Sequence, residues 1–332
     1  MLPPLGQPIR NEAIANPEPD AVAVAFGPPV DAWAKEKLPD GEQWIAQVKW
    51  DGVRILTYFD GHSVRLFNRR RHERTKQFPE LLCFEQYGTA SSAILDGEVI
   101  ALRGGKPSFH EVMKRDSLRN VVKLGQARRA VPIVYMVFDI LYHNGLWVTD
   151  RPLRERQQIL AAVLKPSDDV RLVENFAAMD SLFEAVVKAQ MEGIVCKDLN
   201  STYKIGGKDE RWQKRKNYRD VIAVIGGARL NGGAVAAVLL GLYDELGRLV
   251  YIGQAGTGRL TQSDWRQLTG CLKALAVAKS PFASSILGAR PAVWVRPVVT
   301  VKVRFLEWTD GGLLRQPSIQ AVVDVLPTEC CF

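Results

Sequence analysis

The sequence contains no apolar run that approaches the roughly 18 residues of a membrane-spanning helix, and its N-terminus lacks a basic segment followed by an apolar stretch. These absences argue against membrane-embedded and secreted classes, so we expect a soluble, cytoplasmic protein without membrane contact. Only five of the 332 residues are cysteine, and no two of them form a C-x-x-C pair. The sequence therefore indicates neither a disulfide framework nor a zinc cluster, and it fits a reducing compartment.

The composition is that of a globular protein with an excess of positive charge. Hydrophobic residues make up 47% and aromatic residues 8% of the chain, enough to bury the cores of two domains. Lysine and arginine total 44 against 36 aspartate and glutamate, which gives a net charge of +8. This excess favours a polyanionic partner, because basic side chains that neutralise phosphates release condensed counterions. Charge alone leaves open a basic enzyme without such a partner.

The pattern along the first two thirds of the chain predicts mixed α and β structure. Residues 1–43 are rich in proline and alanine and show no period, so irregular structure is expected there. Strands are expected at Trp44–Lys49, Val53–Phe59 and Val64–Asn68, the last two joined as a hairpin. Helices are expected at Phe109–Arg129, Leu153–Leu164 and Asp180–Met191, with Asp180 as the N-cap of the third.

After Lys216 the pattern changes to short β-rich runs separated by glycine-containing turns. The runs are Val221–Ile225, Ala234–Tyr243, Leu249–Gly253 and Val298–Phe305, with a helix expected at Ser263–Ala278. Short strands with one helix suit a five-stranded barrel of the oligonucleotide-binding type. We therefore expect a first domain at 1–217 and a second at 218–332. The segment 219–332 holds 12 basic and 8 acidic residues, so half of the positive excess lies in each domain.

Lys49 opens the hexapeptide Lys-Trp-Asp-Gly-Val-Arg, a K-x-D-G-x-R pattern that ends at Arg54. A lysine amine must lose its proton before it can act as a nucleophile, and nearby cations and desolvation favour that loss. The pattern supplies one such cation five residues downstream. Taken alone, it also fits an exposed lysine beside an ordinary Asp-Gly turn.

Further short motifs follow Lys49. They are Asp96-Gly97-Glu98-Val99-Ile100, Val137-Phe138-Asp139-Ile140-Leu141, Glu192-Gly193-Ile194-Val195-Cys196-Lys197 and Trp212-Gln213-Lys214-Arg215-Lys216, and near the end Val303–Thr309 and Gly312–Ser318. In this order the motifs resemble those of the covalent nucleotidyltransferase superfamily, specifically the ATP-dependent DNA ligases. The last two resemble the end of the bacterial end-joining ligase domain of the LigD type. The resemblance covers nearly the whole chain.

The resemblance implies an α+β fold, in which a nucleotidyltransferase domain of antiparallel, ATP-grasp-like sheets with helices precedes an OB-fold β-barrel. It implies a DNA ligase that seals nicks in duplex DNA, in repair or end joining, through a lysine–AMP intermediate made from ATP with Mg²⁺. The implied partners are nicked or broken duplex DNA and, by family analogy only, a Ku-like end-binding protein. We expect a monomer associated with the nucleoid. We also expect a minimal ligase, since no DNA-binding domain fits ahead of Lys49 and no polymerase or nuclease domain is attached.

The resemblance also assigns roles to the phosphate-binding and metal-binding residues. Lys49 is the expected nucleophile, and Lys214 and Lys216, which a strand would project to one side, are expected to hold phosphate. Glu98 is expected to contact ribose or Mg²⁺, and Glu192 to help hold Mg²⁺. Taken singly, each of these residues would fit a solvated surface position.

The remaining assignments concern the nucleotide. Phe138 is expected to stack on adenine, with Ile194 or Val195 on the opposite face. Arg54 and Arg69 are expected to contact the nucleotide or the 5′-phosphate of the nick, and Lys197 the α-phosphate. Gln47 and Val48 complete the expected nucleotide-binding set.

A basic stretch offers a further contact with DNA. It runs through Met113–Arg129 and contains Lys114, Arg115, Arg119, Lys123, Arg128 and Arg129. As a helix it would lie along the duplex and position the enzyme without reading sequence. An ordinary exposed amphipathic helix explains the same pattern equally well.

Two positions depart from the family pattern. Ligases of this kind usually carry glutamate two residues before the lysine, where it binds the adenine amino group, and here that residue is Gln47. An amide can still accept a hydrogen bond through its oxygen, but without the contribution of charge, which bears on base preference. The family's C-terminal arginine and Asp-Lys pair are absent, because the corresponding residues 321–326 read Ala-Val-Val-Asp-Val-Leu. Either Arg315 or another group orients pyrophosphate, or self-adenylylation is slow, or the chain works from a preloaded AMP state.

Three functions remain in competition. The first is an ATP-dependent DNA ligase. The second is an RNA ligase or a capping-type guanylyltransferase, which share the lysine motif, although residues 303–318 argue against capping. The third is a non-catalytic nick-binding remnant of a ligase, against which the presence of Lys49, Glu98, Glu192, Lys214 and Lys216 argues. A remnant would bind nicked duplex without forming a covalent AMP adduct.

Overall fold

The computed structural model describes residues 29–256, 258–284, 286 and 293–332. The chain divides into two compact units between Asn217 and Tyr218. The strands of the first unit are β1 (Asp31–Ala34), β2 (Trp44–Val48), β3 (Val53–Phe59), β4 (Val64–Asn68), β5 (Ala93–Arg103), β6 (Lys106–Pro107), β7 (Ile133–His143), β8 (Leu146–Trp147), β9 (Val170–Leu172), β10 (Gly193–Asp198) and β11 (Lys208–Lys216). Its α-helices are α2 (Phe109–Asp116), α3 (Val121–Ala130), α4 (Leu153–Val163) and α5 (Met179–Lys188).

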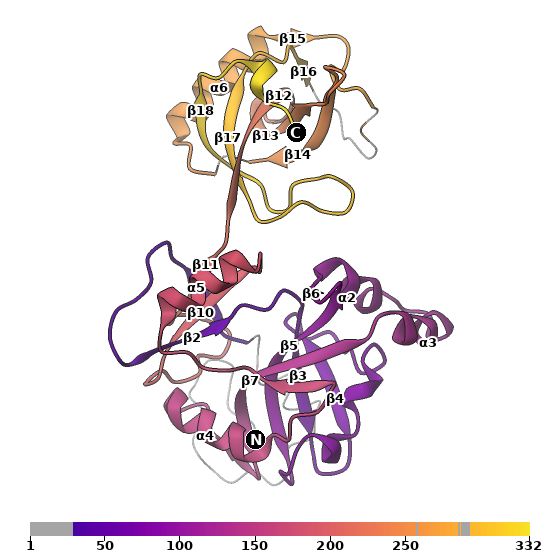
Figure 1. Ribbon diagram of the computed structural model, residues 1–332, viewed down its shortest axis with the longest axis vertical. Coiled ribbons are helices and arrows are strands. Elements are labelled where there is room, and N and C mark those ends of the chain that lie inside the picture. The colour runs from indigo at the N-terminus through magenta and orange to yellow at the C-terminus, as the bar shows by residue number, and fades with distance from the viewer. Residues whose placement is uncertain (1–28, 257, 285, 287–292) are drawn as a thin grey trace. The chain divides into compact units, whose positions relative to one another are not determined.

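The first unit is built on two sheets (Figure 1). The central sheet has the order β4-β3-β5-β7-β8, with β6 paired to β5 and β9 paired to β7. One of its faces buries Ile55, Leu95 and Val137 in a core to which α2 and α4 contribute. On the other face, Leu56 joins a second cluster with Trp212 of the other sheet. Both faces of the central sheet are therefore covered.

The second sheet has the order β1-β11-β10-β2, and we call it the lysine sheet. Successive residues of a strand point to opposite faces, so each strand contributes alternate residues to each side. Ala46, Ile194 and Cys196 pack with Leu182 and Val186 of α5 on one face. Their neighbours in sequence consequently lie on the opposite face, which carries the candidate site.

Two motif glycines are explained by close approach of the backbone. A Cβ at Gly193 would lie 2.2 Å from the carbonyl oxygen of Arg215, and the φ of +149° disfavours other residues as well. A Cβ at Gly52 would lie 2.2 Å from the carbonyl oxygen of Val99. Glycine at these positions lets β10 approach β11, and the Lys49 loop approach β5.

The second unit contains the strands β12 (Arg219–Asn231), β13 (Ala234–Tyr243), β14 (Leu249–Ala255), β15 (Ala276–Val277), β16 (Val293–Val295), β17 (Thr300–Phe305) and β18 (Ser318–Val323), and the helix α6 (Gln262–Ala274). β12 pairs with both β13 and β17, β13 pairs with β14, and β17 pairs with β18. A parallel bridge between Gly256 and Ser318 joins the end of β14 to β18 and closes the ring. This closure, with α6 between β14 and β17 in sequence, confirms the OB-fold type.

The structure confirms the α+β fold class and the hairpin of β3 and β4, and it corrects several element boundaries. The helix expected at Phe109–Arg129 is two helices, because α2 ends at Asp116 and the Asn120 side chain caps a new helix through the backbone NH groups of residues 122 and 123. The N-cap of α5 is Ala178, so Asp180 lies within the first turn. The stretch expected to be irregular contains β1, and its first 28 residues lie outside the described part. In the described part of the chain, no helix has the length and apolar character needed to cross a membrane.

Candidate active site

The lysine motif and the Glu192 motif meet directly. Lys49, Lys214 and Lys216, which we call the lysine cluster, lie on the face of the lysine sheet opposite α5, because Lys214 pairs with Val195 and Lys216 with Gly193 across β10 and β11. The Lys49 ammonium donates to one oxygen of the Glu192 carboxylate, and the Lys216 ammonium lies 3.2 Å from the other. One carboxylate thus holds two of the three lysines. Burial lowers the pKa of Lys216. The nearby charges of Lys49 and Lys214 lower this pKa further, while Glu192 opposes the shift.

A second carboxylate, from Asp31 at the start of β1, holds the third lysine. One Asp31 oxygen accepts from Lys214 at 3.2 Å, and the other lies 3.1 Å from the Arg69 guanidinium. Burial would raise the pKa of Asp31, but the two cations outweigh it and hold the pKa below its usual value. Each Asp31 oxygen thus pairs with one cation, Lys214 or Arg69. Two oxygens of a bound phosphate could pair with the same two cations. Sequence reasoning missed Asp31, since it lies in a proline-rich stretch without a period.

Glu98, on β5, is the candidate carboxylate with the most perturbed environment. Burial raises the pKa of Glu98 to about 8, against the influence of Lys49 and Arg54, while Glu192 and Asp51 add to the rise. A carboxyl group of this kind beside a second carboxylate fits Mg²⁺, which proteins commonly hold through one or two carboxylates together with substrate phosphates. Within the described ranges there is no cluster of three or more His, Cys, Asp or Glu residues suited to a metal. Glu98 and Glu192 could therefore hold Mg²⁺ only together with oxygens supplied by a nucleotide.

Arg54 is more deeply engaged than the motif suggests. Its Nε and Nη2 donate to both oxygens of the fully buried Asp96, at 2.9 and 2.6 Å, and its Nη1 donates to the Val30 carbonyl at 2.6 Å. Tyr203 donates its hydroxyl to the same Asp96 carboxylate at 2.6 Å. Burial would lower the pKa of Arg54, but Asp96 outweighs it and raises the pKa. All three guanidinium nitrogens of Arg54 are thus engaged. The expected contact with a nucleotide or a DNA phosphate could use only an N–H group that these bonds leave over.

A parallel buried pair lies beside it. The Arg156 guanidinium donates to both oxygens of Asp139, each at 2.9 Å, and both side chains are fully buried. Arg156 also donates to the backbone oxygens of Arg151 and Ser201. This pair ties α4 and the loop after β10 to β7. The Val-Phe-Asp motif therefore supplies a structural anchor in Asp139, next to Phe138.

Lys197 does not lie with the lysine cluster. Its ammonium lies 4.4 Å from the centroid of the Phe138 ring and 4.1 Å from that of Trp212, and it has no hydrogen-bond partner in the described structure. Burial lowers the pKa of Lys197 to about 7, although Asp139 and Asp96 oppose this. The side chain is 2% exposed. The structure thus places Lys197 among aromatic rings, which differs from the expected contact with the α-phosphate.

Replacing Lys197 by methionine is expected to change how stability depends on pH. Because the folded-state pKa is near 7 and the usual value is 10.5, the unfolded chain binds more protons between these pH values, so wild-type stability rises with pH across that window. Lys197→Met removes this contribution and is expected to stabilise the protein by on the order of a few kcal/mol at pH 7, and by progressively less toward pH 10. Urea unfolding at both pH values measures the difference. The exposed Lys188→Met serves as the control, and an equal gain for Lys197→Met at all pH values would contradict the assignment.

The remaining nucleotide residues divide between the two faces of the lysine sheet. Gln47 pairs with Val195 across β2 and β10, so both side chains share the face of the lysine cluster. Val48 instead packs its side chain against the α5 core, so the expected contact of Val48 with a nucleotide would have to be made by its backbone. Phe138 is half-buried on β7, and Arg54 and Lys197 both lie over its ring, at 5.2 and 4.4 Å.

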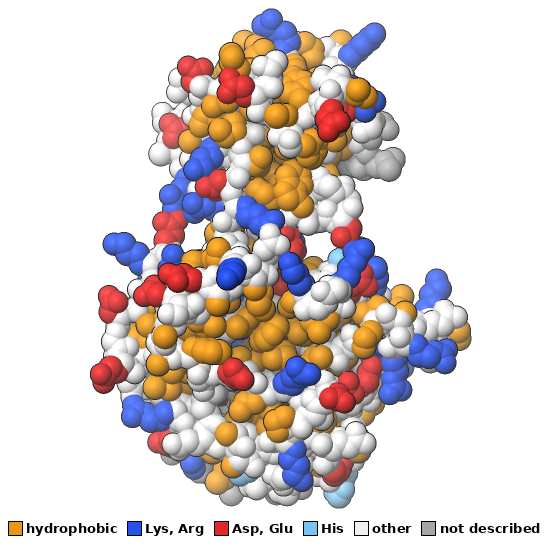
Figure 2. Space-filling view, viewed as in Figure 1, with side chains coloured by type: hydrophobic (Ala, Val, Ile, Leu, Met, Phe, Trp, Pro, Cys, Tyr) orange, Lys and Arg blue, Asp and Glu red, His pale blue; other side chains and the backbone are white. Residues whose placement is uncertain are grey.

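The structure separates the residues of the expected DNA-contact helix. Lys114, Arg119, Lys123, Arg128 and Arg129 are exposed on α2, α3 and the turn between them. Arg115 is fully buried, where it donates to the carbonyls of Gln77 and Val131 and pairs with Glu80, so it is removed from the expected contact. Figure 2 shows Lys and Arg side chains at the edge that α3 forms in Figure 1. In the second unit, Arg315 donates to Glu307 at 2.7 Å and is not held free for pyrophosphate.

Together the fold and the site define a nucleotidyltransferase unit followed by an OB-fold unit. Residues 32–216 match the family model of the ATP-dependent DNA ligase domain, and residues 231–324 match that of the ATP-dependent DNA ligase C-terminal region. The chain belongs to the family of ATP-dependent DNA ligases.

Individual relatives support the same family. The multifunctional non-homologous end joining protein LigD of Mycolicibacterium smegmatis is 30% identical over 321 residues, covering 95% of this chain and 40% of the relative. DNA ligase 2 of Methanosarcina acetivorans is 30% identical over 317 residues, covering 90% of this chain and 54% of the relative. The chain thus spans about half the length of these relatives or less. A solved structure of a Lig E DNA ligase shares the fold, with 18% identity, a TM-score of 0.56, and coverage of 89% of this chain and 100% of that one.

Proposed function

We propose that the chain is an ATP-dependent DNA ligase that seals nicks in duplex DNA through an AMP adduct on Lys49. The observation that carries the proposal is the contact of the Lys49 ammonium with Glu192, beside Lys216 and within the same sheet as Lys214. A single reactive amine, a carboxylate that orients it and flanking cations for phosphate oxygens are what attack on a nucleotide α-phosphorus requires. Residues 1–217 act as the adenylation domain and residues 218–332 as the OB-fold domain.

In the first step the Lys49 amine, released from Glu192 and deprotonated, attacks the α-phosphorus of ATP. A P–N bond forms and the bond to pyrophosphate breaks, which leaves AMP on Lys49. Lys214 and Lys216 hold the phosphate oxygens on which charge develops. When bound by Glu98 and Glu192, Mg²⁺ supplies further charge neutralisation at the phosphates.

Two transfers then complete the cycle. An oxygen of the 5′-phosphate at the nick attacks the same phosphorus, and the P–N bond to Lys49 breaks as the nitrogen regains a proton. The 3′-hydroxyl next attacks the 5′-phosphorus, loses its proton and expels AMP. Arg69 contacts the DNA phosphate in this proposal, which its 54% exposed side chain, paired with Asp31, supports. Phe138 and Val195 flank the base.

The setting we propose is DNA repair or end joining, because the relative from Mycolicibacterium smegmatis is named as an end joining protein. The exposed arginines and lysines of α2 and α3 would follow the duplex backbone, which makes binding dependent on salt and independent of sequence. A monomer that works beside a Ku-like end-binding protein, in association with the nucleoid, fits this setting.

The test follows label from nucleotide to DNA. Protein stripped of bound nucleotide is incubated with α-labelled ATP and Mg²⁺. One portion of the reaction is then denatured to detect label on the protein, and the other portion is given nicked duplex DNA. We expect label on the protein, then on the DNA 5′ end, then in free AMP as the nick closes. Parallel reactions with GTP and with nicked RNA test the capping and RNA-ligase alternatives. Binding of nicked duplex without any label on the protein would overturn the ligase proposal in favour of a binding remnant.

A further inference from the structure

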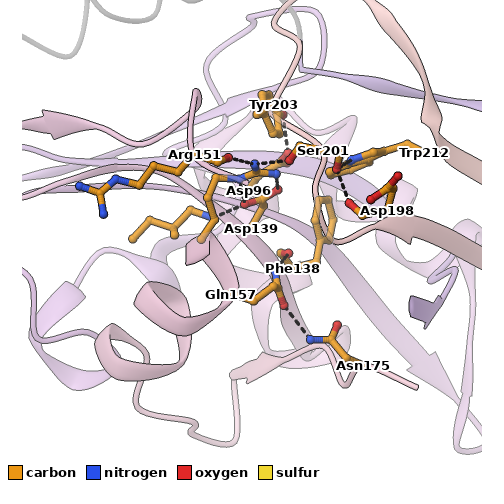
Figure 3. Close-up of polar contacts among 12 residues, drawn as sticks. Asp96, Phe138, Asp139, Arg151, Gln157, Asn175, Asp198, Ser201, Tyr203 and Trp212 are labelled. Atoms are coloured by element: carbon orange, nitrogen blue, oxygen red, sulfur yellow. Dashed lines mark hydrogen bonds and ion pairs between the residues drawn. The ribbon is translucent and has the colours of Figure 1, made fainter. Parts of the chain in front are cut away.

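Three side-chain amides link Gln47 to the backbone of Phe138, and we call them the amide chain. Gln47 Nε2 donates to Asn175 Oδ1 at 2.7 Å, Asn175 Nδ2 donates to Gln157 Oε1 at 3.0 Å, and Gln157 Nε2 donates to the Phe138 carbonyl at 2.8 Å. Figure 3 labels Asn175, Gln157 and Phe138 and marks the hydrogen bond between the two amides. Asn175 and Gln157 belong to no motif that sequence reasoning identified.

The direction of the amide chain is fixed at one end. A backbone carbonyl can only accept, so Gln157 must turn its NH₂ group toward Phe138 and its oxygen toward Asn175. Asn175 must then donate to that oxygen and present its own oxygen to Gln47. Gln47 consequently donates with Nε2 and keeps Oε1 for another partner. Each amide orientation follows from the one before it, so the assignment holds without distinguishing amide nitrogen from oxygen by position.

Gln47 Oε1 is placed to meet a bound base. Gln47 is 2% exposed and lies two residues before Lys49, on the same face of the lysine sheet as Val195. Its oxygen makes no hydrogen bond within the described part of the chain. A flat base held between Phe138 and Val195 would bring its edge toward this oxygen. Gln47 Oε1 is not among the fully buried side-chain atoms that lack a hydrogen-bond partner in the described residues, so it stays accessible to a ligand that donates a hydrogen bond.

We propose that Asn175 and Gln157 are positioning residues that set base specificity by holding the Gln47 amide as an acceptor. The inference rests on the proposed function and deepens it. A base with an exocyclic amino group, as in adenine, donates to Oε1, whereas a base with a carbonyl at that position meets oxygen with oxygen. With the amide reversed, Nε2 would instead donate to that carbonyl. Specificity therefore depends on what prevents Gln47 from turning over.

A glutamate at position 47 would not need such a chain. Both carboxylate oxygens accept, so the side chain presents an acceptor whichever way it turns. An amide has one acceptor and one donor end, and only a directed set of neighbours selects between them. The replacement of the family's glutamate by Gln47 thus makes Asn175 and Gln157 matter for the choice of base.

The test measures the ratio of kcat/KM for covalent labelling with ATP and with inosine triphosphate, which carries a carbonyl in place of the amino group. Asn175 is exposed, so Asn175→Ala leaves the core intact. We expect this variant and Gln157→Met each to lower the preference for ATP about tenfold, because the amide is then free to turn over. Gln77→Met is the matched control, since Gln77 donates to the Leu118 carbonyl at 3.0 Å outside the amide chain.

A double substitution separates orientation from general damage. In a Gln47→Glu background, Asn175→Ala is expected to leave the ATP preference within about twofold of that of the single variant, because a carboxylate needs no orientation. An unchanged ratio in both Asn175→Ala and Gln157→Met would overturn the inference, as would an equal fall in the Gln47→Glu background. Wild type that takes label from neither nucleotide would overturn the proposed function, and the inference with it.

Discussion

Replacing Lys49 by alanine is expected to abolish the covalent AMP adduct and, with it, nick sealing from ATP. The alanine has no nucleophile, and we expect neither Lys214 nor Lys216 to substitute, because the proposal assigns both to the phosphate oxygens and not to attack on phosphorus. The same variant is expected to keep sealing a nick that already carries AMP on its 5′-phosphate, because that step uses the 3′-hydroxyl and the phosphate-binding lysines. Labelling with α-labelled ATP and gel assays of both DNA substrates measure the two activities.

The control for this variant is Lys37→Ala, which removes an exposed lysine of the same unit. It should label and seal as wild type does. Label retained by Lys49→Ala would show that another residue is the nucleophile. Loss of sealing on the pre-adenylylated nick, with the fold intact, would show instead that Lys49 is needed after the first step.

Replacing Glu192 by glutamine is expected to give the second largest effect, a fall in the adenylylation rate on the order of 10²–10³-fold, as for removal of one preorganised charged group from an active site. Glu192 uses both oxygens to hold Lys49 and Lys216, and an amide has only one acceptor. The variant also loses one of the two carboxylates that fit Mg²⁺. Since the positive charge at the site rises by one, we expect the KM for ATP to stay unchanged or fall while kcat falls.

Rapid-quench measurement of adduct formation at several ATP concentrations separates these two parameters. Glu184→Gln on α5, an exposed carboxylate in the same unit, is the matched control and should be silent. A rise in KM with an unchanged kcat would contradict the assignment, because it would mean that Glu192 stabilises the bound ground state and the transition state equally.

Much of the fold could be predicted because several of its strands are apolar runs bounded by turns. β3, β4 and β13 have the predicted bounds, since each is a run of apolar or β-branched residues that ends at a turn. The prediction of one helix at 109–129 was wrong, because the apolar spacing continues across the break between α2 and α3. The sequence does carry the signal for that break, in Asn120, whose side chain caps α3.

The candidate site was predictable where residues lie in motifs and less so where partners come from elsewhere. The motifs place Lys49, Glu192 and Lys216 in one contact, as expected for adjacent strands. Nothing in the local sequence pairs Asp31 with Lys214, because that contact depends on a parallel strand 183 residues away.

The other differences from the predicted site concern buried cations. A motif lysine or arginine is read as facing the ligand, yet Arg54 is held by Asp96 and Lys197 by two aromatic rings. Whether a cation faces a ligand or a core depends on which side of the strand is covered. That depends on how the two sheets of the first unit pack, which periodicity within one strand does not reveal.

The central claim is that Lys49 carries the AMP, and peptide mapping of the adduct by mass spectrometry tests it most directly. Stripped protein would be charged with ATP and Mg²⁺, digested at a pH that preserves the phosphoramide bond, and fragmented. We predict AMP on the peptide that contains Lys49, lost after incubation with nicked duplex DNA. AMP on Lys197, Lys214 or Lys216, or an adduct on Lys49 that nicked DNA does not discharge, would contradict the account.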